Sequence, residues 1–181
     1  HDADKGWHPT SDANERVEKL TGATNGDDGT GGVDGKGEYW KVTTADGTQY
    51  FFGRNKLPGW SDNGTAADDP VTNSTWTVPV FGNHSGEPCY NSSFASAWCQ
   101  QAWRWQLDYV VDPRGNAMAY YWSKESNNYG RNVSEFGGKA TVTPYVRGGW
   151  LERIDYGLRD TTVYSGKAMG RVDFGVTSRC L

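Results

Sequence analysis

The chain has 181 residues, and its composition is rich in glycine (24) and in aromatic residues (9 Trp, 10 Tyr and 6 Phe), while its hydrophobic fraction is 35%. Few aliphatic and many aromatic side chains are typical of a β-sheet protein that turns often, whereas a helical bundle needs more leucine and alanine. The formal net charge of −4 argues against a basic surface that binds nucleic acid through its phosphates. The length suits one domain or two small ones.

No apolar run is long enough to cross a bilayer, and the first ten residues, HDADKGWHPT, lack the pattern of a signal peptide. We therefore expect no membrane span, and we expect any export signal to lie upstream of this sequence. A surface rich in acidic residues, glycine, asparagine and threonine is common in secreted proteins. The composition therefore favours a secreted or cell-surface protein.

The chain divides by pattern into an irregular Gly/Asp-rich lead-in, residues 1–37, and a β-rich domain, residues 38–181. Within the lead-in, 14–20 (NERVEKL) suggests a short strand or a helical turn. Residues 23–37 are dense in glycine and aspartate and bury nothing that offsets their ordering entropy, which predicts a mobile loop. Its aspartates do not match the spacing of a calcium loop, and a closing glutamate is missing; they are Asp27, Asp28 and Asp34.

The β-rich part opens with a hairpin over 38–52, in which EYWKVTT and TQYFFG flank a turn at Asp46-Gly47. Residues 75–81 (TWTVPVF) predict a strand, and Pro79 places it at an edge or a bulge because proline donates no hydrogen bond. Residues 94–101 (FASAWCQQ) carry the one helix signal, a short one.

The densest apolar stretch, 103–122 (WRWQLDYVVDPRGNAMAYYW), predicts one long hairpin. Alternate residues are apolar on both arms, which is the pattern of a strand with one buried face. The predicted buried positions are Trp103, Trp105, Leu107, Tyr109 and Val111 on the first arm, and Met118, Tyr120 and Trp122 on the second. Proline, glycine and asparagine in 112–116 supply the turn.

A polar loop is expected from Trp122 to about Thr143, followed by strands over 150–158 (WLERIDYGL) and 169–176 (MGRVDFGV). In the first of these, Ile154, Tyr156 and Leu158 share one face. Several strands joined by glycine-rich turns predict an all-β fold of antiparallel hairpins with an aromatic core. It is either a sandwich or an open shell segment, with at most one short helix.

Three cysteines bear on the compartment. Cys89 and Cys99 close a short loop and predict a disulfide in an oxidising compartment, the alternative being two buried thiols, and Cys180 is left over. Zinc is not favoured, because there is no C-x-x-C pair and the three histidines are scattered. We expect no metal and no cofactor.

One stretch carries a family resemblance. LDYVVDPRGNAMAYYW, followed by LERIDYG about 30 residues later, resembles the D-x-x-G-N-x-x-x-Y-x-Y signature of RHS/YD-repeat proteins and of the related β-shell of Tc-toxin B components and SpvB-like toxins. Over roughly 38–181, the ordered set of motifs is similar to a segment that precedes the repeats in large secreted RHS proteins of actinobacteria. The tandem array and the autocleavage motif of that family are not found in this sequence.

The resemblance implies a non-catalytic segment that helps build or cap a β-shell around a C-terminal toxin, with the rest of its own parent polypeptide as partner. It implies turn and shell roles for nine residues. They are Tyr109, Asp112, Gly115, Asn116, Tyr120, Trp122, Ile154, Tyr156 and Gly157.

Two other functions remain open from the sequence. The first is a carbohydrate-binding module for surface glycans, in which exposed rings stack on sugars; the rings least explained by strand alternation are Trp7, Trp60 and Trp98, whose simpler interpretation is core or loop packing. The second, more remote, is a copper-dependent polysaccharide oxygenase using His1 with His8 or His84. We expect His84 not to activate the adjacent Ser85, because neighbours in an extended loop point apart. Carboxylate pairs such as Asp68-Asp69 and Glu152-Asp155 are expected to be solvated charges.

Overall fold

The computed structural model describes residues 6–8, 10–11, 14–29, 36–64, 68–133 and 138–177. Over these residues the chain is all-β, as predicted, with one 3-10 turn, η1 (Phe94–Ser96). The strands are β1 (Arg16–Leu20), β2 (Tyr39–Thr43), β3 (Gln49–Phe52), β4 (Thr75–Phe81), β5 (Trp98–Trp105), β6 (Leu107–Val111), β7 (Asn116–Arg131), β8 (Thr141–Arg159) and β9 (Gly170–Asp173). No helix in the described part of the chain is long and apolar enough to span a membrane.

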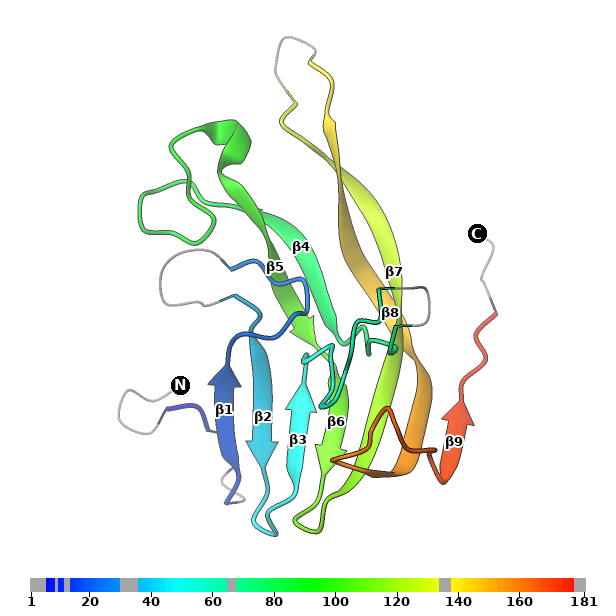
Figure 1. Cartoon of the computed structure of the whole chain (residues 1–181). Helices are drawn as coiled ribbons and strands as arrows, with labels where there is room; N and C mark the ends of the chain where they lie inside the picture. The colour runs from blue at the N-terminus through cyan, green and yellow to red at the C-terminus, as the bar shows by residue number, and fades with distance from the viewer. Residues whose placement is uncertain are drawn as a thin grey trace.

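The strands form two antiparallel sheets. Seven strands follow the order β1-β2-β3-β6-β7-β8-β9, and β4 pairs with β5 in a second, two-stranded sheet. Figure 1 shows the β4–β5 ribbon and the distal half of the β7–β8 hairpin rising beyond the seven-stranded sheet. The lower part of the molecule is therefore one open sheet, and the upper part is made of two projecting arms.

The register defines the two faces of the seven-stranded sheet, because residues paired directly across strands share a face. One face, here the covered face, contains the hydrophobic core. Its buried members are Phe51, Tyr109, Ala117, Ala119, Tyr121 and Leu158. Two loops cover it, with Leu57 from the loop after β3 and Val163 from the loop after β8. Both loops lie over the sheet in Figure 1.

The opposite face, here the open face, carries an apolar band that crosses all seven strands. None of its side chains is buried; they are Val17, Val42, Tyr50, Val110, Met118, Tyr120, Ile154, Tyr156 and Val172. At its upper end Trp40 packs edge-on against Trp105 of β5, with ring centroids 6.0 Å apart. Among the described residues, no side chain of the second sheet is packed in this way on the rest of the apolar band.

Tryptophans join the two sheets. Trp76 of β4 is 4% exposed and contacts Trp103 of β5 and Trp122 of β7, with ring centroids 5.8 and 6.5 Å apart. A Cβ on Gly149 of β8 would lie 2.9 Å from Trp76 Cζ2 and would clash with the Ser123 carbonyl oxygen. Only glycine fits where the small sheet packs on β8.

The long hairpin predicted over 103–122 is divided between the two sheets. Trp103 and Trp105 belong to β5, which pairs with β4, and only Tyr109–Val111 of β6 pairs with β7. The prediction of its turn is correct: Gly115 has φ 77°, and its N–H donates to the Asp112 carbonyl. The chain passes from the two-stranded sheet to the seven-stranded sheet at Gln106. Alternation of apolar residues alone does not reveal that the strand changes its partner there.

Strand β7 buries the face opposite to the one that the sequence predicted. Ala117, Ala119 and Tyr121 are buried, whereas Met118, Tyr120 and Trp122 lie half-buried on the open face. The ring of Tyr109 fills the space opposite Ala119, its cross-strand partner, so small residues occupy the core positions of β7. On β8, the bulge at Gly157 (φ 69°) likewise places Leu158 in the core and Tyr156 outside it.

Two further expectations were wrong. The polar stretch expected to be a loop from Trp122 to about Thr143 forms the distal parts of β7 and β8, paired as far as Arg131 with Thr141. Backbone hydrogen bonds sustain this ladder where side chains give no apolar alternation. The helix expected over 94–101 is limited to η1, and β5 begins at Trp98. For 14–20, the strand alternative is correct, as β1 pairs with β2.

Candidate functional site

The D-x-x-G-N segment forms a self-contained turn. Asp112 Oδ1 accepts hydrogen bonds from the backbone N–H groups of Arg114 and Asn116, each at 2.8 Å, and its Oδ2 accepts one from Asn116 Nδ2 at 2.7 Å. These bonds, led by the one from the Asn116 side chain, lower the pKa of Asp112. Arg159 Nη1 donates to Asn116 Oδ1 at 2.6 Å. The motif residues therefore hold the β6–β7 turn against the end of β8.

The other residues that the resemblance singles out are spread over both faces. Tyr109 is 2% exposed in the core. Tyr120, Ile154 and Tyr156 lie on the open face of β7 and β8, and Trp122 lies above them against Trp76. Gly157 forms the bulge, where a Cβ would lie 2.6 Å from Met169 Cβ. The set therefore does not converge on one pocket.

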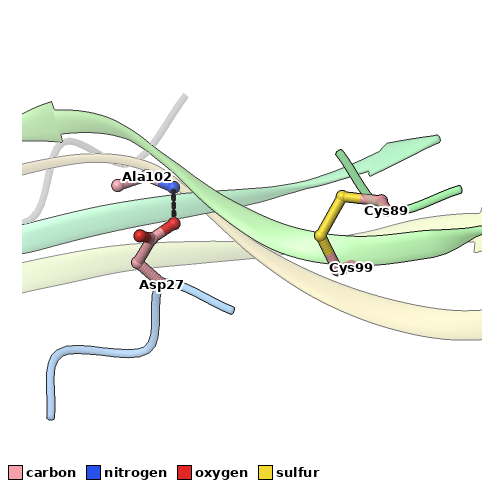
Figure 2. Close-up of a disulfide and its surroundings, with 4 residues drawn as sticks. All are labelled: Asp27, Cys89, Cys99 and Ala102. Atoms are coloured by element: carbon pink, nitrogen blue, oxygen red, sulfur yellow. Dashed lines mark hydrogen bonds between the residues drawn. A yellow bond between two sulfur atoms is a disulfide. The ribbon is translucent and has the colours of Figure 1, made fainter. Parts of the chain in front are cut away.

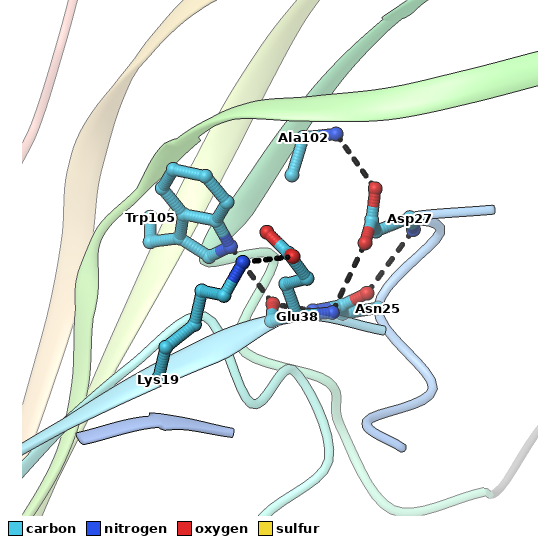
Figure 3. Close-up of polar contacts among 6 residues, drawn as sticks. All are labelled: Lys19, Asn25, Asp27, Glu38, Ala102 and Trp105. Carbon is cyan, nitrogen blue, oxygen red and sulfur yellow. Dashed lines mark hydrogen bonds and ion pairs between the residues drawn. The ribbon is translucent and has the colours of Figure 1, made fainter. Parts of the chain in front are cut away.

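A network of polar contacts, here the polar junction, ties the lead-in to both sheets (Figure 3). Asp27 Oδ1 accepts from the backbone N–H of Ala102 in β5 at 2.9 Å, and Oδ2 accepts from that of Glu38 at 3.0 Å. The Glu38 carbonyl accepts from Trp105 Nε1 and Asn25 Nδ2, both at 2.8 Å. The Glu38 carboxylate pairs with Lys19 of β1 at 2.9 Å.

This junction overturns the prediction of a mobile loop for the described part of 23–37. Asn25 and Asp27 are 3% and 8% exposed, and Asn25 also donates to the Gly53 carbonyl at 2.7 Å. Their partners lie up to 75 residues away, so the local sequence gave no signal of their burial. Asp27 uses both oxygens on backbone N–H groups; Asp34 lies outside the described residues.

Sequence reasoning also missed Asp108, which is completely buried beside the loop that covers the core. Its Oδ2 accepts from Ser74 Oγ at 2.6 Å, Thr72 Oγ1 at 2.9 Å and the Asn55 backbone N–H at 2.9 Å. Its Oδ1 has no partner. Burial raises the pKa of Asp108 to about 6, against the opposing effect of these hydrogen bonds. Asp108 fastens the covering loop to β6.

The predicted disulfide between Cys89 and Cys99 is present (Figure 2). It links the loop after β4 to the start of β5, with the two Cα atoms 5.2 Å apart. Both cysteines are buried. A disulfide is compatible with an oxidising, extracellular environment. Cys180 lies outside the described residues.

The candidate catalytic groups do not assemble into a shared cleft. His84 Nδ1 lies 3.3 Å from Glu87 Oε1 in an exposed loop, and Glu87 Oε2 accepts from the backbone N–H groups of Asn83 and His84. Those two bonds lower the pKa of Glu87. No group of three or more His, Cys, Asp or Glu side chains within the described ranges is placed to hold a metal ion. His1 lies outside those ranges.

The members of the two carboxylate pairs differ in their surroundings and do not face each other across a shared site. Asp69 Oδ2 accepts from the Ser61 backbone N–H at 2.9 Å, and Asp68 Oδ1 accepts from the Asn63 N–H at 2.7 Å, so both organise the loop after β3. Glu152 is exposed on β8, whereas Asp155 is 6% exposed and pairs with arginines. Asp155 is therefore not the solvated charge that the sequence suggested.

The three unexplained tryptophans are engaged by neighbours within the chain. Trp60 lies under Lys56 Nζ, 3.4 Å from its ring centroid, and Trp98 lies under the Arg131 guanidinium at 3.8 Å. Trp7 contacts Trp40 edge-on, with centroids 4.9 Å apart. Loop and arm packing therefore accounts for these rings.

A separate aromatic groove lies between the two projecting arms. Val78, Pro79 and Phe81 of β4 face Tyr129 and Tyr145 of the β7–β8 hairpin across a space of about 310 Å³. The Phe81 ring stacks on Phe94, which is 70% exposed. Sequence alternation did not indicate this groove, because the distal β7–β8 hairpin was itself not predicted.

Comparisons with known proteins give no relative for this arrangement. No family model matches the chain, and no curated protein and no solved structure is significantly similar to it.

Proposed function

We propose that this chain is a non-catalytic structural segment of a large secreted RHS-repeat toxin, and that it helps build or cap the β-shell around a C-terminal toxin. The sequence resemblance of the D-x-x-G-N hairpin and the following LERIDYG strand suggests the family. The observation that carries the proposal is the open face, which is apolar across seven strands and has no buried side chain.

The open face is unusual for a chain that functions alone. A sheet of this size normally buries one face and presents polar side chains on the other. Here Val42 and Tyr50 pair across β2 and β3, Tyr156 and Val172 are 44% and 42% exposed, and the band is continuous between them. Large contiguous apolar patches mark surfaces that contact something else.

The edges of the sheet support the same role. β1 pairs only with β2, and β9 pairs only with β8, so each presents one unpaired side among the described strands. Beyond β9, Phe174 and Val176 are 43% and 55% exposed. An edge strand with unpaired backbone groups is a template for a further strand. In a shell, the neighbouring turns of the same polypeptide supply that strand and cover the apolar band.

The test is the size of the native product. We expect an immunoblot of the source culture, probed with antibody against this chain, to detect a polypeptide of well over ~1,000 residues, far beyond one ordinary domain. The isolated chain should also bind the dye ANS through its open face, and the long product should bind less dye per copy of the segment. A secreted species of only the 20.0 kDa of this chain would contradict the proposal.

A carbohydrate-binding module is the second candidate, and the aromatic groove between the arms favours it. Rings of Phe81, Phe94, Tyr129 and Tyr145 line this groove and its extension, with the amide of Asn128 beside them. Binding of neutral oligosaccharides such as cellohexaose, abolished by Tyr129→Ala and unchanged by Trp60→Ala, would establish this function. The absence of binding to a panel of such sugars would exclude it.

A further inference from the structure

A cleft of about 430 Å³ lies where β8 and β9 meet the two covering loops. This basic cleft is lined by Arg153 and Arg171 from the strands and by Lys167 from the loop after β8, together with Tyr121, Asp155 and Asp69. None of the roles assigned above uses the cleft. Its size is that of a small-molecule site.

The floor of the basic cleft is a buried carboxylate that orients two guanidinium groups. Asp155 Oδ1 accepts from Arg171 Nε at 2.6 Å, and Oδ2 accepts from Arg171 Nη2 at 3.2 Å. Arg153 Nε lies 3.2 Å from the same Oδ2, and its guanidinium lies 3.8 Å from the centroid of the Tyr121 ring. The Tyr121 ring and the ion pair with Asp155 restrain the Arg153 guanidinium, so its ordering costs less entropy on binding.

Donors remain after these contacts are made. Asp155 accepts hydrogen bonds from Nε and Nη2 of Arg171, whereas Arg153 Nε lies at ion-pair distance from it without a hydrogen bond, and each guanidinium has five N–H groups. Lys167 and Ser165 are exposed on the facing loop. Asp69 is the opposing charge on the rim, and its Oδ2 is held by the Ser61 backbone N–H and hydroxyl. Three cations and two carboxylates line the cleft, in a chain of net charge −4, and the neighbouring Asp173 also acts on Arg171.

We infer that the basic cleft binds an oxyanion, the carboxylate or phosphate group of a small molecule. A guanidinium can donate bidentate hydrogen bonds to two oxygens of a carboxylate or a phosphate, and a nearby ammonium adds charge without demanding a direction. The charges around the cleft nearly balance, so a polyanion such as nucleic acid gains little attraction from it. This inference is independent of the shell role, because it rests on the covered face.

The test titrates the 181-residue chain with sodium phosphate and with sodium acetate, against sodium chloride at equal ionic strength, and follows amide NMR signals and the melting temperature. We expect saturable shifts at residues 165–171 in the millimolar range and a rise in melting temperature, since a ligand that binds the native state stabilises it. The anion with the lower dissociation constant identifies the preferred group. Saturation absent with both anions, or shifts scattered over other basic residues, would overturn the inference.

Variants separate the site from general charge effects. Lys167→Gln should weaken binding by about fivefold or more, and Arg153→Lys should weaken it as well, because it keeps the charge and loses the bidentate fork. Lys139→Gln is the matched control, since it removes the same charge from an exposed residue on the distal β7–β8 hairpin. Equal weakening by Lys167→Gln and Lys139→Gln would show screening by net charge and would contradict a site.

Discussion

The two faces of the seven-stranded sheet differ in how they are built. On the covered face, small and large side chains interlock beneath loops, as Ala119 does opposite Tyr109. On the open face, Val42, Tyr50 and Val110 are as apolar as the residues of the covered face, yet each remains partly exposed. Apolar character alone therefore does not distinguish the core of this protein; the loops that lie over one face do. Substitutions matched across the two faces measure that difference.

The largest effect is expected at Tyr109, which is 2% exposed at the centre of the covered face. Tyr109→Ala should lower the free energy of unfolding by about 3–5 kcal/mol, because it leaves a large cavity. Tyr120→Ala, on the open face of the adjacent strand, should cost about 1 kcal/mol or less. Urea denaturation monitored by tryptophan fluorescence measures both. Equal losses would mean that the open face is packed as tightly as the core.

Tyr109→Phe is the control for the hydroxyl. The Tyr109 hydroxyl oxygen is buried without a hydrogen-bond partner, and burial raises the pKa of the phenol to about 12. Its removal should leave stability unchanged or raise it by about 1 kcal/mol, since a buried polar group without a partner costs free energy. A marked loss of stability in Tyr109→Phe would indicate that the Tyr109 hydroxyl makes a stabilising hydrogen bond.

The second effect is pH-dependent and belongs to the loop that covers the core. The pKa of Asp108 is raised to about 6 in the fold from 3.8, so the folded state holds the proton more tightly than the unfolded state. Its contribution is therefore fully present below about pH 3.8 and is lost as the pH rises through about 6. The loss should be about 3 kcal/mol, from a shift of about two pKa units.

Asp108→Asn isolates this contribution from that of all other carboxylates. The amide oxygen retains the acceptor for Ser74, Thr72 and Asn55 but does not ionise. The difference in unfolding free energy between the parent chain and Asp108→Asn should decline by about 3 kcal/mol from pH 3.5 to pH 7. A difference that stays constant with pH would show that Asp108 keeps its ordinary pKa.

The third effect lies away from both faces. Replacing both Cys89 and Cys99 with serine should cost about 2–3 kcal/mol in the loop-entropy account of a short disulfide loop. Amide hydrogen exchange should accelerate in the upper part of β4 and β5, whereas the amides of Tyr109 and Ala119 should keep their protection. Uniform acceleration would mean that the arm and the sheet unfold as one unit.

The sequence predicted the parts of this fold that depend on neighbouring residues. The turns at Asp46-Gly47 and Asp112–Asn116 have the conformations that their glycines allow, with φ 84° at Gly47. The distal β7–β8 hairpin escaped prediction because polar side chains carry no alternation, while its backbone pairing needs none. The buried face of β7 was reversed because a small residue opposite a large ring is a core position that hydrophobicity does not mark.

Much of the candidate site was beyond local reasoning for another reason. Asp108 and Asp27 look like ordinary strand and loop aspartates, and their burial depends on donors 34 and 75 residues away. The basic cleft likewise combines β8 and β9 with two loops. Contacts of this range follow from the sheet topology, which a single sequence does not specify. The disulfide was predictable because only cysteines form such a bond and the chain has only three of them.

The smallest expected effect is the most direct test of the comparison. Val42→Thr keeps the shape and the strand preference of a residue on the open face, and it should change stability by at most about 0.5 kcal/mol. Val163→Thr makes the same change at a side chain 6% exposed on the covered face, where burying a hydroxyl should cost about 1–3 kcal/mol. Because the two substitutions are chemically identical, their difference in urea denaturation reports the environment alone. If the chain is part of the long polypeptide proposed above and neighbouring turns of its shell cover the open face, the cost of Val42→Thr in that polypeptide should rise toward that of Val163→Thr.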